Sequence, residues 1–214
     1  MTAPDPAPTI RAAMTTARPT STQAAIRALF EASAQARDAF LAEGAAELER
    51  AIDVIAGALQ SGRKLLLFGN GGSAADAQHL AAELVGRFLR ERRPLPAIAL
   101  TTDTSALTAI GNDYGFEDVF ARQVRALGAA GDVAVAISTS GRSPNVLRAV
   151  EAAKAGGLTV VALTGGDGGP LAKAADVCLR VAASTLSSRI QETHILIGHV
   201  ICELVDRRLF GEAS

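Results

Sequence analysis

The chain has 214 residues, a formal net charge of −1, 49% hydrophobic residues and 20% charged residues. This balance excludes a disordered chain, and the near-zero charge argues against a basic face that grips nucleic acid without sequence preference. No run of about 18 uncharged apolar residues occurs, so we expect no membrane-spanning segment. The length predicts one domain of about 100–200 residues with extensions.

The N-terminal segment predicts a flexible tail over residues 1–20, followed by a single domain over residues 21–214. The tail holds four of the eight prolines and lacks the apolar centre of a signal peptide. Arg11 and Arg18 among several threonines leave an organellar transit peptide as the alternative. Cys178 and Cys202 stand in apolar contexts and are too few for a disulfide framework, which favours two buried thiols and a reducing, cytoplasmic location.

The first predicted secondary structure is helical and covers residues 22–59. Apolar residues recur there at steps of three and four between Ala, Glu, Arg and Gln. Gly44 is a candidate break between two helices. Because long amphipathic helices precede any strand, we expect them to pack against a neighbouring molecule as well as against the rest of the chain.

After Ser61 the chain alternates short apolar runs with helical segments. The predicted strands cover residues 64–68, 96–100, 133–137, 158–163 and 177–181. The predicted helices cover residues 74–89, 104–110, 118–127, 144–155, 170–174 and 189–209. Apolar strands alternating with helices predict an α/β fold, in which a five-stranded parallel sheet is covered on both faces as a three-layer sandwich. Ligands of such sheets bind outside the carboxyl ends of the strands.

The loop after the first strand is glycine-rich and covers residues 69–73, with the sequence GNGGS. Glycine lets backbone N–H groups approach a ligand, and the helix that follows adds a positive dipole end, so the loop favours an anion or a hydroxyl-rich ligand. A dinucleotide site would need an acidic residue about 20 positions on, and a Walker site would need a lysine; both are missing. A tight strand-to-helix turn is the plain structural alternative.

The loop after the third strand carries four hydroxyl groups within residues 138–144, with the sequence STSGRSP. Hydroxyls, free N–H groups and a helix N-terminus together predict a phosphate-binding site that needs no metal. Helix capping explains Ser143 and Pro144 but not the run from Ser138 to Ser140. The glycine-rich segment over residues 164–170 lacks such a run, and we expect a structural turn there.

The three histidines and one carboxylate suggest a metal site. His79 and Glu83 are four residues apart and share a helix face. Gln191 and His199 lie on the last predicted helix, and His194 is an equally plausible partner by spacing alone. Two histidines and a carboxylate suit zinc. Unrelated helix-surface residues are the alternative.

Five segments together resemble the sugar isomerase (SIS) domain, and within it the bacterial phosphoheptose isomerases. The segments are GNGGSAADAQHLAAEL, AIGNDYGF, ISTSGRSPNV, TGGDGG and RIQETHILIGHVICELV. The resemblance implies a flavodoxin- or Rossmann-like SIS domain with N- and C-terminal helices, in a cytoplasmic homotetramer whose active sites lie between subunits. It also implies conversion of sedoheptulose 7-phosphate to D-glycero-D-manno-heptose 7-phosphate, the first step toward the nucleotide-activated heptose of surface polysaccharides such as lipopolysaccharide.

The resemblance also assigns residues to roles. One zinc ion per subunit is implied, with the ligands His79, Glu83, Gln191 and His199. Glu83 is the implied base and His199 the implied acid of an aldose–ketose isomerisation through an enediol. The implied substrate contacts are Asn70, Gly71, Gly72, Asn112, Asp113, Ser138, Thr139, Ser140, Ser143 and Gln191. Ser73 is added because it closes the same glycine loop.

Two positions depart from the family pattern. Ser188 stands where many members have Asp, and Ala82 stands where some have a second Glu. Two non-enzymatic alternatives share the domain. One is an adaptor that binds the bacterial replication initiator but lacks the full ligand set. The other is a regulatory module that senses a phosphosugar, which usually comes attached to another domain.

Overall fold

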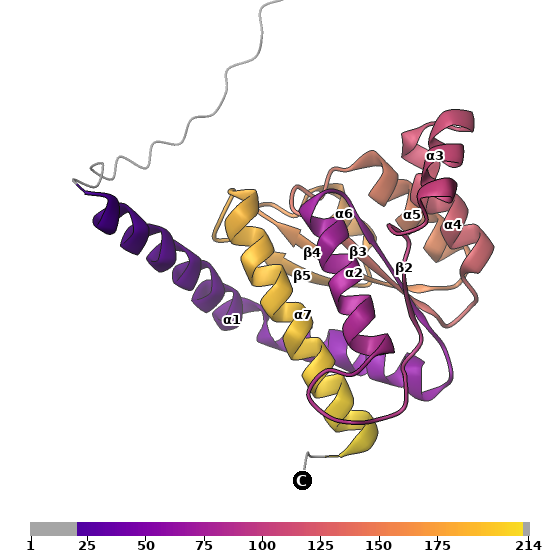
Figure 1. Cartoon of the computed structure of the whole chain (residues 1–214), viewed down its shortest axis with the longest axis horizontal. Coiled ribbons are helices and arrows are strands. Elements are labelled where there is room, and N and C mark those ends of the chain that lie inside the picture. The colour runs from indigo at the N-terminus through magenta and orange to yellow at the C-terminus, as the bar shows by residue number, and fades with distance from the viewer. Residues whose placement is uncertain (1–20, 212–214) are drawn as a thin grey trace, which may run out of the picture.

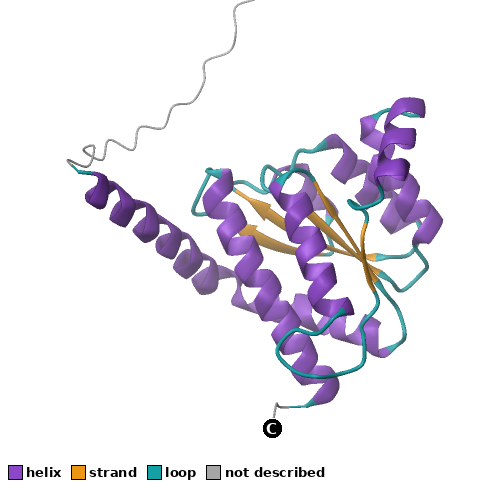
Figure 2. Ribbon diagram, in the orientation of Figure 1, coloured by secondary structure: helices purple, strands orange, loops and turns teal. Residues whose placement is uncertain are grey.

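A five-stranded parallel sheet lies at the centre of the molecule, with helices on both faces (Figures 1 and 2). The computed structural model describes residues 21–211. The predicted tail therefore lies outside the described residues, and the domain boundaries stay a prediction. The elements in chain order are α1 (Thr22–Gln60), β1 (Leu65–Gly69), α2 (Gly72–Val85), β2 (Ala97–Ala99), α3 (Thr104–Asp113), η1 (Phe116–Asp118), α4 (Val119–Leu127), β3 (Val133–Ser138), α5 (Pro144–Ala155), β4 (Thr159–Gly165), α6 (Gly169–Ala174), β5 (Val177–Val181) and α7 (Ser187–Phe210).

The strand order places the loops that matter for function. The order is β2-β1-β3-β4-β5, and every neighbouring pair is parallel. Because β1 lies between β2 and β3, the order reverses at the β1/β3 pair, which is the switch point where ligands bind in open α/β sheets. Gly69 pairs with Ile137 at this edge, so the glycine loop and the serine loop leave the sheet side by side.

Alternate strand residues supply two separate cores, which explains the uniformly apolar runs. Leu65 and Leu67 of β1 pack with α1, α2 and α7 on one face. Leu66 and Phe68 pack with α4 and α5 on the other. A strand buried on both faces has no polar side to alternate with the apolar one. The predicted α/β fold and its five strands are confirmed, with strand boundaries within two residues.

The predicted break at Gly44 is wrong, since α1 is one helix of 39 residues. A Cβ at this position would lie 2.7 Å from the Phe40 ring, so glycine lets that ring lie against the helix backbone. An isolated glycine costs a helix only about 1 kcal/mol, which the packing of the second half of α1 on β5 and α7 outweighs. The first half points away from the sheet (Figure 1) and exposes Ile26, Leu29 and Phe30.

The segment after α2 also differs from the prediction. The helix expected over residues 74–89 begins at Gly72 and ends at Val85, and a loop leads from there to β2. The backbone N–H of Leu95 in this loop donates to the carbonyl of Leu84, so the loop folds back onto the helix end. Within residues 21–211, no helix is both long enough and apolar enough to cross a membrane. Both cysteines are free thiols, and Cys202 is buried as expected, whereas Cys178 on the edge strand β5 is only half-buried, so the expectation of two buried thiols is wrong for Cys178.

Candidate active site

A pocket opens at the switch point between β1 and β3. It is lined by Asn70, Ser73, Ile137, Ser138, Thr139, Ser143, Ser187 and Gln191. These residues come from the glycine loop, the serine loop and the first turns of α7. Six of the predicted substrate contacts therefore meet in one place, although they are spread over more than 120 positions of the sequence.

Two glycines allow the close approach that shapes this pocket. A Cβ at Gly69 would lie 2.7 Å from the carbonyl oxygen of Ile137, so the glycine lets the loop pass directly over β3. A Cβ at Gly72 would overlap the side-chain amide of Gln191 and lie 2.8 Å from its Cδ. Gly71 has a φ of +56°, a conformation that side chains disfavour. The glycine loop is therefore more than a generic turn.

Asn145 orients the predicted contact Asn70 and was missed from the sequence. The two side-chain amides exchange a pair of hydrogen bonds, each 2.9 Å long, and Asn145 is buried. The available signal was an amide directly after Pro144, in the first turn of a helix that otherwise presents apolar residues to the core. A buried amide needs such a partner, because an unpaired one carries a large desolvation cost.

The hydroxyls of the serine loop point in different directions. Ser143 occupies the N-cap position of α5, but its hydroxyl makes no capping bond and instead lies 3.1 Å from the Ser138 hydroxyl. The capping role expected for this side chain is therefore wrong, and the hydroxyl stays in the pocket. The Ser140 hydroxyl accepts from the backbone N–H of Arg142 and is not part of the pocket wall.

Ser187, at the start of α7, lines the pocket and was also missed from the sequence. Its hydroxyl lies 3.4 Å from that of Thr139. The neighbouring Ser188 is the position that departs from the family pattern. The last helix was expected to begin at residue 189, but α7 begins at Ser187. This earlier start places the Ser187 hydroxyl at the helix N-terminus.

The third glycine-rich segment supports the serine loop, as expected of a structural turn. A Cβ at Gly141 would overlap the carbonyl group of Gly168, so the two backbones touch. Arg142 donates two hydrogen bonds to the Asp167 carboxylate, of 2.8 and 2.6 Å. These bonds hold the pKa of Asp167 well below its usual range. The Arg142 guanidinium is therefore already paired with a carboxylate of the neighbouring loop.

A second cluster of polar side chains lies further along α2 and α7. His79 and His199 approach each other with an Nε2–Nε2 distance of 3.0 Å. The Glu83 carboxylate lies 3.3 Å from His79 Nε2, and the Phe88 ring stacks on His199 at a centroid distance of 5.6 Å. Phe88 lies in the loop that was expected to be helix, so its contact could not be foreseen.

His194 has a different, structural environment. Its ring is completely buried and its Nε2 lies 3.1 Å from the carbonyl oxygen of Thr164. Burial lowers the pKa of His194 to about 4, because the charged form cannot be solvated there. Of the two histidines that spacing left open, His199 is the one that faces His79.

Asp76 belongs to the same face of α2 as His79 and Glu83 and was also missed. The spacing of three and seven residues was a readable signal, since it keeps side chains in line on a helix. Burial raises the pKa of Asp76, while the charge of nearby His79 opposes the rise. Its Oδ2 atom is buried without a hydrogen-bond partner in the described chain.

Three predicted site residues lie apart from the histidine cluster. Gln191 contacts Gly72 at the pocket, about 12 Å along the axis of α7 from His199. Asn112 and Asp113 lie on α3, where the Asn112 amide donates to the Asp113 carboxylate at 2.8 Å. Both are exposed, and α3 has no buried residue. A single chain therefore does not bring the whole predicted set together.

The donor types of the histidine cluster fit a zinc ion, although the site is not preformed. No three His, Cys, Asp or Glu side chains among residues 21–211 are already arranged to hold a metal. Two nitrogen ligands of a tetrahedral zinc ion lie about 3.3 Å apart, close to the separation of His79 and His199. The carboxylate of Glu83 and the unpartnered oxygen of Asp76 place negative charge beside them.

Comparisons with known proteins show the family of the chain. A sequence model of the SIS domain matches residues 28–165. The phosphoheptose isomerase of Aquifex aeolicus is 56% identical over 181 residues, which are 85% of this chain and 94% of the relative. That of Rhodospirillum rubrum is 54% identical over 176 residues, covering 81% and 93% of the two chains.

Solved structures give the same result. The phosphoheptose isomerase of Neisseria gonorrhoeae superposes with a TM-score of 0.82 at 49% identity, and that of Francisella tularensis with 0.84 at 42%. In each case the match covers 87% of this chain and 99% of the other. The chain therefore belongs to the phosphoheptose isomerase family of SIS-domain proteins.

Proposed function

We propose that the protein isomerises sedoheptulose 7-phosphate to D-glycero-D-manno-heptose 7-phosphate. The observation that carries this proposal is the placement of two complementary groups along the same pair of helices. A hydroxyl-lined pocket lies at the start of α2 and α7, and a carboxylate with two imidazoles lies further along them. The first group suits a phosphosugar, and the second suits proton transfer. The names of the similar proteins support the same substrate.

The phosphate group would bind at the serine loop. Ser138, Thr139 and Ser143 present hydroxyls to the pocket, and the N-terminus of α5 supplies free N–H groups and a positive dipole end. Because Arg142 is already paired with Asp167, phosphate recognition would rest on hydroxyl and N–H donors. Asn70, fixed by Asn145, and Gln191 would contact the sugar hydroxyls.

Glu83 and His199 would carry out the proton transfers. Glu83 takes a proton from C1 of the ketose while His199 gives a proton to the C2 oxygen, which yields the enediol. Glu83 then returns its proton to C2, and the C1 hydroxyl gives its proton back to His199 to form the aldehyde. Protons and electrons balance without any oxidant, and each transfer needs a group within hydrogen-bonding reach of the reacting atom.

One zinc ion per subunit would be held by His79, Glu83, Gln191 and His199. A bound zinc ion polarises the sugar oxygens and stabilises the negative charge that develops on the enediol. Binding would require the Gln191 side chain to reach along α7 toward His199, or a change in its contact with Gly72.

The working form would be a cytoplasmic homotetramer with active sites between subunits. Exposed apolar side chains on the first half of α1 and on α7 support this assembly, among them Phe30 and Leu196. Helix α3 has no buried residue within its own chain, as a helix at a subunit contact would. A site shared between subunits would give Asn112 and Asp113 their predicted role. The product would feed the synthesis of nucleotide-activated heptose for surface polysaccharides such as lipopolysaccharide.

The adaptor and regulatory alternatives are not favoured. The relatives at 54–62% identity are named phosphoheptose isomerases. A more distant structural neighbour, the Vibrio vulnificus NanR protein complexed with ManNAc-6P, superposes with a TM-score of 0.62 at 17% identity, which shows a shared fold alone.

The test is to incubate the purified protein with sedoheptulose 7-phosphate and to follow aldose formation by NMR. We expect turnover that a chelator removes and that added zinc restores, from a particle with the mass of four chains by light scattering. No turnover under any metal condition would reject the isomerase. Turnover that the chelator does not change would reject the proposed role of zinc but not the isomerase activity. An active monomer would reject the proposed active site between subunits.

A further inference from the structure

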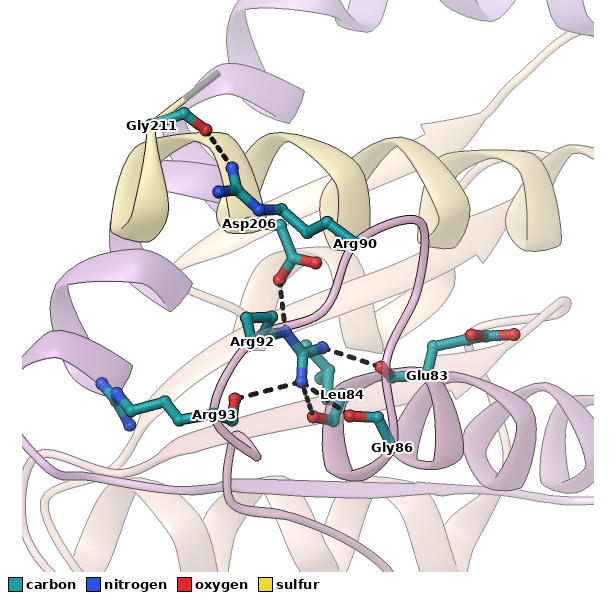
Figure 3. A network of polar contacts seen from close by, with 8 residues as sticks. All are labelled: Glu83, Leu84, Gly86, Arg90, Arg92, Arg93, Asp206 and Gly211. Carbon is teal, nitrogen blue, oxygen red and sulfur yellow. Dashed lines mark hydrogen bonds and ion pairs between the residues drawn. The ribbon is translucent and has the colours of Figure 1, made fainter. Parts of the chain in front are cut away.

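Arg92, in the loop between α2 and β2, forms a network of hydrogen bonds with the end of α2 and with Asp206 of α7 (Figure 3). Its side chain is only 2% exposed. The guanidinium donates to Asp206 Oδ1 at 2.9 Å. It also donates to the backbone carbonyls of Glu83, Leu84, Gly86 and Arg93. All of its nitrogen atoms therefore take part in hydrogen bonds.

These contacts fix the end of the helix that carries His79 and Glu83. The last carbonyls of a helix have no partner within the helix and form its negative dipole end, which a cation stabilises. Arg92 supplies both the charge and the donors, and the planar fork of its guanidinium sets their directions. The carbonyl of Glu83 itself is one of the acceptors, at 2.9 Å from Arg92 Nη2.

The same guanidinium joins this helix end to α7. Asp206 lies seven residues after His199 on α7, a spacing that keeps both residues on one face of the helix. Its side chain is 4% exposed, and its Oδ2 atom has no hydrogen-bond partner among residues 21–211. Figure 3 shows Arg92 between the end of α2 and Asp206. One side chain thus links the backbone of Glu83 to the helix that carries His199.

We propose that Arg92 is a positioning residue, which holds Glu83 and His79 in register with His199 by clamping α2 to α7. This role rests on the proposed function, because it has meaning only if Glu83 and His199 act on the substrate. Residues that orient the groups around a metal or a reacting centre typically affect activity or metal affinity by about 10- to 100-fold.

A second buried ion pair provides a matched control for a purely structural role. Lys64 donates to Asp132 at 2.6 Å, and the Asp132 side chain is 2% exposed. This pair lies just before β1 and β3, at the amino ends of the strands and opposite the candidate site. Loss of Lys64 therefore removes a buried ion pair without touching α2 or α7.

The experiment compares Arg92→Met and Lys64→Met with the wild type in the full chain. It measures kcat and KM for sedoheptulose 7-phosphate, zinc affinity by competition with a chromogenic chelator, and Tm. All kinetics are run well below the lowest Tm. Since Arg92→Met leaves Asp206 as a buried unpaired charge, the double variant Arg92→Met/Asp206→Leu is included, because apolar replacement of both partners often preserves stability.

We expect Arg92→Met and the double variant to lower kcat and zinc affinity by about 10-fold or more, with KM changed less than about twofold. Lys64→Met should keep kcat and zinc affinity at wild-type values despite a lower Tm. If Arg92→Met does not fold, the double variant alone decides by the same criteria. The positioning role would be overturned if Arg92→Met, or the double variant where Arg92→Met does not fold, kept the wild-type kcat. It would also be overturned if Lys64→Met lost as much kcat as that variant. A wild type without turnover would reject the proposed function and this role with it.

Discussion

Replacement of Gly72 by alanine should displace Gln191 without harming the fold. Gly72 is the first residue of α2 and is exposed, and it does not have the positive φ of its neighbour Gly71. Alanine favours a helix over glycine by up to about 1 kcal/mol, so Tm should stay constant or rise. The added Cβ would lie 2.8 Å from Gln191 Cδ, whereas carbon atoms in contact prefer about 3.5–4.0 Å. The Gln191 amide must therefore retreat by about 1 Å.

If Gln191 contacts the substrate as proposed above, a retreat of about 1 Å breaks its hydrogen bond to the sugar. A net loss of about 0.5–1.5 kcal/mol corresponds to a rise in KM of about 2- to 13-fold. Steady-state kinetics with sedoheptulose 7-phosphate and a thermal melt measure both effects. Gly57→Ala is the control, since its added Cβ would have no atom of the described residues within 4 Å apart from its chain neighbours and the backbone of its own helix. A folded Gly72→Ala enzyme with unchanged KM would refute the contact, and a fall in kcat alone would point to a metal-ligand role for Gln191.

Two further outcomes follow from the structure. Ser140→Ala should raise KM more than it lowers kcat if this hydroxyl helps to hold the phosphate, and an unchanged KM would remove Ser140 from the set. Because the pKa of His194 is lowered to about 4 in the fold, the unfolded chain binds the extra proton below its own pKa of about 6.5. The contribution of neutral His194 to the free energy of unfolding should therefore be fully present above pH 6.5. At pH 5 the free energy of unfolding should be about 2 kcal/mol lower. Urea unfolding at both pH values measures this loss, and a His194→Gln variant that loses as much would contradict the assignment.

Much of the fold could be predicted from local patterns. The strands are buried on both faces, so runs such as residues 133–137 carry an unmistakable apolar signal. The prediction failed at Gly44, where the fit of the Phe40 ring against the helix outweighs an isolated glycine. It also failed after Val85, where a loop folds back because Arg92 and Leu95 bond the carbonyls of the helix end. The first failure depends on how closely the Phe40 ring packs against Gly44, and the second involves the contact of Arg92 with the distant Asp206, and apolar periodicity describes neither.

The candidate site was predictable to the extent that its residues lie in loops at strand ends. Parallel strands bring such loops to one edge, which is why the glycine loop and the serine loop were both expected at the carboxyl ends of the strands, while the contacts Asn70 and Ser138 came from the family resemblance. Asn145 and Phe88 escaped because their roles depend on which side chains face each other after packing. Asn112 and Asp113 are exposed on α3, which has no buried residue, so their predicted contact with the substrate stays a prediction.

The kcat of Glu83→Gln relative to the wild type tests the central claim most directly. The substitution keeps the size of the side chain and the backbone carbonyl that Arg92 contacts, and it removes the carboxylate that we propose moves the proton between C1 and C2. General base catalysis contributes about 10²- to 10⁴-fold, so kcat for sedoheptulose 7-phosphate should fall at least about 100-fold while the oligomeric state stays that of the wild type. Near-normal turnover by this variant would contradict the account.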